Sequence, residues 1–384
     1  MKRLSSFLFC GLFLLPFAAF WACYWLDAPV PDPLGNTPLP KYPVLKKKQR
    51  WPDDVWMQKA ARTVIARAPL RYRAIQLKND TFSTTAKLLY PVPVNPGHAD
   101  VCWGKDSWLF LLNEAPLHRS ENDFQQMASR AVNLGHLVTK SGRRFFIAPF
   151  PDKVSIYPEY DGLVKQWAEK ESNRAQIPAT MALAFSSTPD LKSSYIPVWQ
   201  ALLQAKTKSS ELLYWERDTH WNYAGMVVAA RTLVNSIEPS LFEDSAVKPD
   251  GVSHGFMSGG GHDLSTIFLL QKGSTEAPKY AVHREGGDPD RQGQHFKSRQ
   301  SRVIKGRTVI VNDSFAEWAA PLLTPWFEDL VFFNHESMNS PEMEKCLQES
   351  DTILWTSVER FLPDRLKIWE DYLGKTLKPK PSTP

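Results

Sequence analysis

The segment ERDTHWNYAG, residues 216 to 225, places an acidic residue and a histidine two positions apart, directly before a stretch with helical periodicity. In an extended segment, residues i and i+2 face the same way, so Asp218 can hydrogen-bond to His220 and fix its tautomer. A neutral imidazole held in this way is suited to general-base catalysis. The alternative interpretation is structural, with Asp218 capping the following helix and His220 packing against it.

A candidate nucleophile lies in RTVIVNDSFAEWAAPLL, where a β-branched run leads into Asn312, Asp313 and Ser314 and then into a short predicted helix. A strand followed by a turn and a helix places Ser314 at the carboxyl end of a parallel strand, where open α/β sheets bind ligands. Backbone N–H groups at the start of the helix could then hold an oxyanion. Ser314, His220 and Asp218 therefore form a predicted catalytic triad, although Asn, Asp and Ser also cap helices.

The same Asp-x-His pattern could ligate a metal, with His254 and His262 of HGFMSGGGHD as further nitrogen ligands. The spacing of these residues matches no zinc motif. In addition, Gly259 to Gly261 indicate a flexible loop rather than a rigid ligand frame. We therefore expect neither a metal ion nor a cofactor.

Four tryptophans lie close in sequence to the two motifs: Trp215, Trp221, Trp318 and Trp326. They could form apolar walls or platforms for a sugar ring, or they could pack in the core, which is the more common place for tryptophan. Trp221 is next to the proposed base, and we take it as the candidate substrate-binding residue.

The elements that would position these residues alternate between strands and helices. Strands are predicted at residues 108–112, 144–150, 308–311, 330–334 and 352–358, with a further one near Ser194, and helices at 123–139, 222–237 and 341–347, with another entering LLQAK. This alternation predicts an α/β domain with a mostly parallel sheet.

The amino terminus begins with Lys2 and Arg3 and continues in an apolar run without a charged residue, residues 7–26. The run is long enough to span a bilayer, which takes about 20 residues, and it ends in the bulky WACYWLD rather than in a small-x-small signal-peptidase site. The positive charges place the first residues in the cytoplasm and the rest of the chain outside the inner membrane. The expected organisation is a cytoplasmic start (1–6), a transmembrane anchor (7–26), a proline-rich linker (27–52), a catalytic domain (53–365) and a tail (366–384).

The composition sets broad limits on the class of protein. A chain of 384 residues with 43% hydrophobic and 23% charged residues suffices for one large domain or two modest ones. The net charge of +5 is spread along the chain apart from the run Lys46 to Arg50, and without a Walker loop or zinc-finger spacing no nucleic-acid partner is indicated. Cys102 and Cys346 lie in the exported part, where they could form a disulfide or remain two separate thiols.

The two motifs resemble those of periplasmic SGNH-hydrolase-like O-acetyltransferases of the alginate acetylation type, AlgJ and AlgX. DTHWN and the later NDSF follow that family's order of Asp, His and Ser. The resemblance extends, in matching order, to GKDSWLFLLNE, PDKVSIYPE, GHDL and DTILWTSVER, and covers about residues 55 to 365. The sequence departs from the family at Asn312 and Ser107, where glycine is common.

The resemblance implies an SGNH-hydrolase-like, flavodoxin-like fold in which Ser314 is the nucleophile, His220 the base and Asp218 its orienting partner. It also implies transfer of an acetyl group to an extracellular or cell-envelope polysaccharide in the periplasm, with an integral-membrane acyltransferase as acetyl supplier. A carbohydrate acetylesterase would use the same triad with water as the acceptor. A non-catalytic polysaccharide-binding scaffold would keep only the fold, and transfer is the function we expect.

We predict that residues 7–26 stay attached to the mature protein, because no favourable cleavage site follows them. Amino-terminal sequencing of the protein purified from membranes checks this expectation. A mature chain that begins near Asp27 would contradict the anchor and leave a soluble periplasmic protein.

Overall fold

The computed structural model describes residues 58–59, 101–111, 119–160, 173, 175–253, 264 and 277–380. The predicted cytoplasmic start, membrane anchor and linker, residues 1–52, lie outside this part of the chain. Among the helices that are described, none combines the length and the apolar character needed to cross a bilayer.

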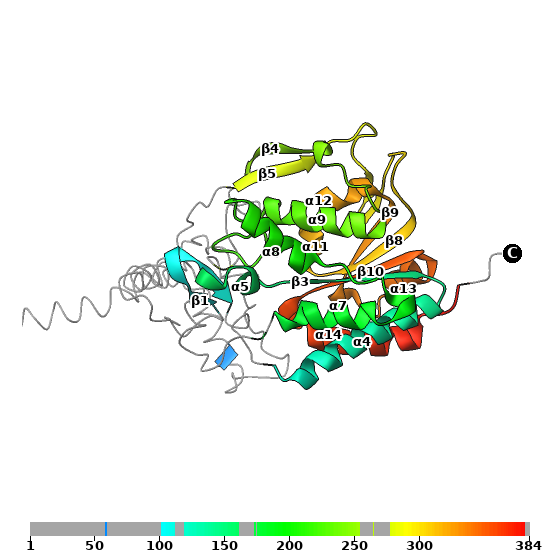
Figure 1. The fold of residues 1–384 in the computed structure, drawn as a ribbon. Coiled ribbons are helices and arrows are strands. Elements are labelled where there is room, and N and C mark those ends of the chain that lie inside the picture. Colours follow the sequence, from blue (N-terminus) through cyan, green and yellow to red (C-terminus); the bar gives the residue numbers. More distant parts are fainter. Residues whose placement is uncertain are drawn as a thin grey trace, which may run out of the picture.

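A six-stranded sheet forms the centre of the described structure (Figure 1). Its strands are β3 (Arg144–Phe150), β6 (Asp290–Gln292), β7 (His295–Lys297), β8 (Ile304–Asn312), β9 (Phe327–Asn334) and β10 (Thr352–Val358). They are arranged in the order β3-β10-β8-β9-β7-β6. The first four in this order run parallel, whereas β7 and β6 extend the sheet in the antiparallel sense. The predicted α/β fold with a mostly parallel sheet is confirmed.

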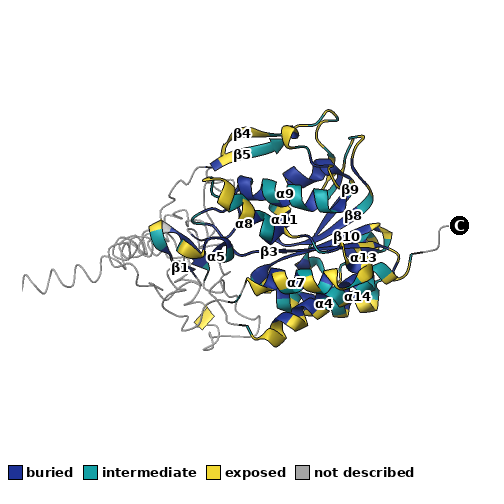
Figure 2. Ribbon diagram, in the orientation of Figure 1, coloured by how far each residue is buried: buried dark blue, intermediate teal, exposed yellow. Residues whose placement is uncertain are grey.

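Helices cover both faces of this sheet (Figure 1). One face carries α4 (Glu121–Lys140), α7 (Gln176–Ser186) and α14 (Leu362–Thr376), and the other carries α8 (Val198–Lys208), α9 (Tyr223–Ile237), α11 (Ser314–Trp318) and α12 (Ala320–Leu323). The remaining helices are α5 (Lys153–Ile156), directly after β3, and α13 (Pro341–Glu349), between β9 and β10. Burial follows this layering, since β10 and most of β3 are buried, β6 at the edge of the sheet is exposed, and the helices are exposed on their outer sides (Figure 2).

The helix predicted over residues 123–139 is confirmed as α4, and its start shows why it forms there. The Ser120 hydroxyl accepts a hydrogen bond from the Asp123 N–H, and the Asp123 carboxylate accepts one from the Ser120 N–H. This reciprocal capping satisfies two N–H groups that the helix itself leaves open. The buried positions follow helical periodicity and include Phe124, Met127, Ala131, Leu134 and Val138.

The predicted strands 144–150 and 352–358 match β3 and β10 from end to end, while 308–311 and 330–334 are the buried parts of the longer β8 and β9. Near Ser194 the expected strand is reduced to one parallel bridge between Ile147 and Tyr195. The extended run stops at Pro197, where α8 begins. The predicted strand 108–112 is β2 (Leu109–Leu111), which pairs in the antiparallel sense with β1 (Val101–Trp103). The antiparallel pair of β4 (Val247–Ser253) and β5 (Ala277–Val282) was not predicted.

The tail predicted over residues 366–384 begins too early. Helix α14 continues to Thr376 and buries Leu366, Trp369, Tyr372 and Leu373. These side chains recur every three to four residues and so form one apolar face, which packs against α4. The carboxyl-terminal helix is therefore part of the core.

A disulfide between Cys102 and Cys346 is not formed. Cys346 on α13 carries a free thiol. Strand β1, which contains Cys102, lies at the opposite end of the described structure from α13 (Figure 1).

A buried histidine lies directly after β9. The Nε2–H group of His335 donates to the Thr356 carbonyl oxygen at 2.8 Å, and the rings of Trp355 and Trp369 lie edge-on to the imidazole. Burial lowers the pKa of His335 to about 4, and the nearby positive charge of Arg365 acts in the same direction. The folded protein therefore holds this imidazole in its neutral form.

We predict that His335 makes stability depend on pH. The unfolded chain binds this proton with a pKa near 6.5, so the contribution of His335 is complete above that pH and is lost as pH falls toward about 4. The shift corresponds to about 3 kcal/mol at most. Denaturant unfolding at several pH values should show a smaller decline for His335→Gln than for the unmodified protein. Parallel curves for the two proteins between pH 7 and 4 would contradict this expectation.

Candidate active site

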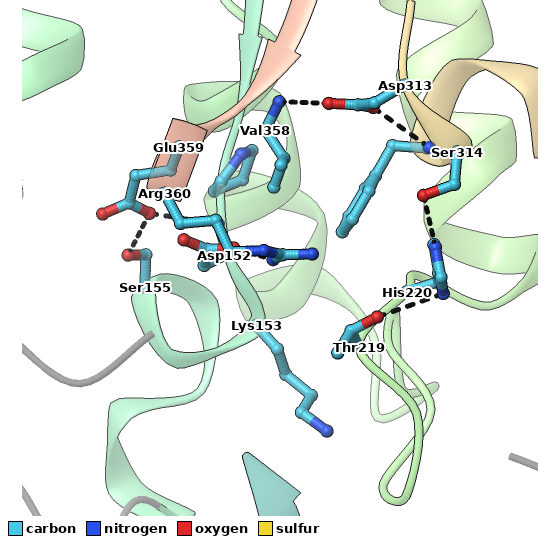
Figure 3. A network of polar contacts seen from close by, with 12 residues as sticks. Asp152, Lys153, Ser155, Thr219, His220, Asp313, Ser314, Val358, Glu359 and Arg360 are labelled. Atoms are coloured by element: carbon cyan, nitrogen blue, oxygen red, sulfur yellow. Dashed lines mark hydrogen bonds and ion pairs between the residues drawn. The ribbon is translucent and has the colours of Figure 1, made fainter. Parts of the chain in front are cut away.

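The carboxyl ends of the four parallel strands meet at one edge of the sheet, and polar residues follow each of them. These residues are Asp152 and Lys153 after β3, Asp313 and Ser314 after β8, His335 after β9, and Glu359 and Arg360 after β10. The carboxyl edge is where open α/β sheets bind ligands. Figure 3 shows most of these side chains converging there.

The three predicted triad residues meet at this edge. The Ser314 hydroxyl lies 2.7 Å from His220 Nε2, and His220 Nδ1 lies 2.7 Å from Asp218 Oδ1. A carboxylate only accepts hydrogen bonds, so Nδ1 carries the imidazole proton and Nε2 presents its lone pair to the hydroxyl. Figure 3 shows the Ser314–His220 contact. This arrangement prepares Ser314 to lose its proton to His220.

Asp218 and His220 lie on a tight turn rather than on the extended segment that we expected. The turn is closed by a bridge between Tyr214 and Trp221 and by a hydrogen bond from the Trp215 N–H to the His220 carbonyl oxygen. Asp218 Oδ1 accepts from the His220 N–H at 2.9 Å as well as from the ring. An aspartate that binds the backbone two residues further on stabilises such a turn, and here it also aligns the imidazole.

Helix α9 follows this turn, and its cap is not Asp218. The Asn222 side chain accepts from the Gly225 N–H at 3.1 Å, so the structural alternative for Asp218 is wrong. A Cβ atom on Gly225 would lie 2.2 Å from the Leu213 carbonyl oxygen. Glycine at this position therefore allows the helix to approach the strand-like segment that precedes the turn.

Asp313 caps the helix that carries the nucleophile. Its carboxylate accepts hydrogen bonds from the N–H groups of Phe315 and Val358 and from the Arg365 guanidinium, at 3.1, 2.7 and 2.6 Å. The capping and the nucleophile interpretations of NDS thus apply to neighbouring residues. The Phe315 N–H is engaged by Asp313, which makes the Ser314 N–H at this helix start a candidate donor to an oxyanion.

Trp221 does not face the site opening. Its side chain is 0% exposed, and its ring packs against those of Phe150 and Phe315. The expectation that Trp221 contacts a sugar is therefore wrong, because strand β3 and helix α11 bury it. Trp318 is half-buried instead and stacks on the His220 ring, with centroids 5.0 Å apart. Its position four residues after Ser314 was the signal for this, since residues i and i+4 share one helix face.

The metal alternative gains no support from the described residues. They contain no group of three His, Cys, Asp or Glu side chains that could hold a metal ion. His254 and His262, the proposed additional ligands, lie outside the described part of the chain.

Charged residues after β3 and β10 were not singled out as site residues from the sequence. Asp152 is fully buried and forms an ion pair with Arg360. Glu359 accepts hydrogen bonds from the Asp152 N–H at 3.0 Å and from the Ser155 hydroxyl at 2.6 Å (Figure 3). These residues lie in the segments PDKVSIYPE and DTILWTSVER, which belong to the sequence resemblance. Only the parallel pairing of β3 with β10 brings the two segments together.

Comparison with known proteins shows which proteins this chain resembles. Residues 101–286 match the family model ALGX, described as the SGNH hydrolase-like domain of the acetyltransferase AlgX. The chain is 29% identical over 164 residues to the probable alginate O-acetylase AlgJ of Pseudomonas syringae pv. tomato, and 27% identical over 165 residues to that of Pseudomonas fluorescens. These matches confirm the predicted resemblance to the AlgJ and AlgX type.

These matches cover only part of each chain. They cover 40% and 41% of this chain and 39% and 40% of the two relatives, so the chain spans about two fifths of the length of the curated relatives it matches. The O-acetyltransferase domain of Pseudomonas putida AlgJ superposes with a TM-score of 0.47 at 15% identity, over 73% of this chain and 99% of that domain. The family match includes Asp218 and His220 but ends before Ser314. The placement of the serine therefore rests on the geometry.

Proposed function

We propose that this chain is an O-acetyltransferase that moves an acetyl group through an acyl-Ser314 intermediate onto a polysaccharide. The observation that carries the proposal is the pair of 2.7 Å contacts linking Ser314 to His220 and His220 to Asp218. The similarity to the AlgX domain and to probable alginate O-acetylases supports acetyl as the group and a polysaccharide as the acceptor.

The first step forms the acyl-enzyme. The Ser314 oxygen attacks the carbonyl carbon of an acetyl donor while its proton passes to His220 Nε2, and His220 then gives this proton to the leaving group. Asp218 keeps the second imidazole proton on Nδ1 and stabilises the imidazolium. The Ser314 N–H is placed to donate to the developing oxyanion.

The second step returns the enzyme to its starting state. A sugar hydroxyl gives its proton to His220, its oxygen attacks the acyl carbon, and the bond to the Ser314 oxygen breaks as that oxygen regains a proton. An acetylesterase differs only in that water replaces the sugar. The stacking of Trp318 on His220 favours transfer, because an indole face beside the base is a suitable platform for a sugar ring.

The proposed setting is the periplasmic side of the bacterial inner membrane. Lys2 and Arg3 before the apolar run 7–26 support a single-pass anchor with the catalytic domain outside. An integral-membrane acyltransferase is the proposed acetyl supplier, in line with the resemblance to the alginate acetylation type.

Incubation with p-nitrophenyl acetate is expected to add one acetyl group to Ser314. Ser314→Ala should abolish the labelling and His220→Ala should reduce it to background, because the hydroxyl is then not deprotonated. Asp218→Asn should slow it by about 10⁴-fold by favouring the wrong tautomer. Intact-protein and peptide mass spectrometry measure the acetyl group. Ser186→Ala is the matched control, since the Ser186 hydroxyl is exposed on α7 and donates only to its own helix.

The acetyl-enzyme is expected to hydrolyse slowly alone and to discharge faster onto an oligosaccharide acceptor. Trp318→Ala should increase the fraction of acetyl lost as free acetate, because it removes the indole beside His220. Chromatography of acetylated sugar and acetate after a single turnover measures this partition. Free acetate as the main product with saturating acceptor, across several glycans, would favour the esterase.

A further inference from the structure

Lys153 is a buried cation next to the turn that carries the triad base. It is the first residue of α5, and its side chain is 0% exposed. The ammonium nitrogen donates to the carbonyl oxygens of Trp215, Glu216 and Asp218 at 3.2, 3.0 and 2.7 Å. These three bonds match the three N–H groups of an ammonium. Figure 3 shows Lys153 directly after Asp152, with its side chain pointing away from the Ser314–His220 contact.

The turn from Trp215 to His220 has no regular ladder of its own. A backbone hydrogen bond joins the Trp215 N–H to the His220 carbonyl oxygen, and the Leu109 N–H donates to the Glu216 carbonyl oxygen from outside the turn. Three carbonyl groups of this short turn converge on Lys153. The ammonium therefore links three points of the backbone on which Asp218 and His220 are carried.

A purely structural role accounts poorly for a lysine at this position. Burying an ammonium costs several kcal/mol, whereas an apolar side chain of similar volume would avoid that cost but leave the carbonyl groups of the turn without this donor. The rings of Phe110 and Trp108 lie 4.9 and 5.5 Å from the ammonium and reduce that cost only in part. The carbonyl groups of the triad turn compensate a further part of that cost.

We propose that Lys153 is the positioning residue of the Asp218–His220 pair, acting by holding the 215–218 backbone so that His220 Nε2 stays within hydrogen-bond distance of Ser314. The role of this pair as orienting acid and base rests on the proposed function. The placement of the imidazole by Lys153 can be measured without turnover. Lys153 touches none of the reacting atoms and acts through Asp218.

The test compares Lys153→Met and Lys153→Gln with Lys206→Met. Lys206 is the control because, unlike Lys153, it donates to one backbone carbonyl, that of Ile156, and its ammonium pairs with the exposed carboxylate of Glu159 rather than with the triad turn. Methionine removes all three donors, and glutamine keeps two donors on a shorter, neutral side chain. Glutamine is neutral and leaves no uncompensated charge, so the glutamine variant tests the positioning role of Lys153 if the methionine variant does not fold.

Two quantities are measured at temperatures well below each variant's melting temperature. The first is the low-field proton resonance of His220 Nδ1–H bound to Asp218, observed by NMR in the resting protein. The second is the rate of Ser314 acetylation by p-nitrophenyl acetate. We expect both Lys153 variants to lose or shift the resonance and to acetylate about 10²-fold more slowly, as a displacement near 1 Å costs. Lys206→Met should resemble the unmodified protein in both.

The outcomes separate the two proposals. An unshifted resonance in a folded Lys153→Gln protein, with an unchanged acetylation rate, would overturn the role of Lys153. If the unmodified protein is not acetylated but its resonance depends on Lys153, the positioning role stands and the proposed function fails. A variant that only lowers the melting temperature, with resonance and rate unchanged below it, would show Lys153 to be structural and also overturn the inference.

Discussion

The parallel alignment of β3, β10, β8 and β9 is the constraint on which the site depends. Val358 at the end of β10 pairs with Phe150 at the end of β3, and Asn312 at the end of β8 pairs with Asn334 at the end of β9. Strands that end level with one another deliver the residues that follow them to one edge. The nucleophile, the buried ion pairs and Lys153 are there for this reason, although they come from distant parts of the chain.

Charge pairing then joins these strand ends laterally. The Asp152–Arg360 pair links the end of β3 to the end of β10, and Asp313 links the end of β8 to Val358 and to Arg365 on α14. Burial lowers the pKa of Arg365, and the charge of Asp313 opposes this shift. Buried pairs contribute little net stability compared with apolar packing, but breaking one leaves a costly unpaired charge. Their main effect here is to restrict how the strand ends can move.

Most of the fold and the identity of the triad could be predicted from the sequence, because both depend on local patterns. The β-branched runs of β8 and β10 predict strands, and the cap and apolar periodicity of α4 predict a helix. Chain order and residue type likewise indicated Ser314 and His220. The features that the sequence did not predict depend on contacts between distant segments. The burial of Trp221 depends on β3 and α11 lying on either side of it, and the role of Lys153 depends on a turn some 60 residues further along.

The helix that carries the nucleophile also encloses the base, and this affects the fate of the intermediate. The His220 ring lies 5.0 Å from Phe315 and 5.0 Å from Trp318, which are the second and last residues of α11. When His220 takes the serine proton, the indole face of Trp318 can stabilise the imidazolium. His220 is almost fully buried and Ser314 only half-buried, so the rings of Phe315 and Trp318 shield the base while part of the serine stays accessible. In the proposed transfer this shielding limits the access of water to His220, which favours a sugar over water as the acceptor.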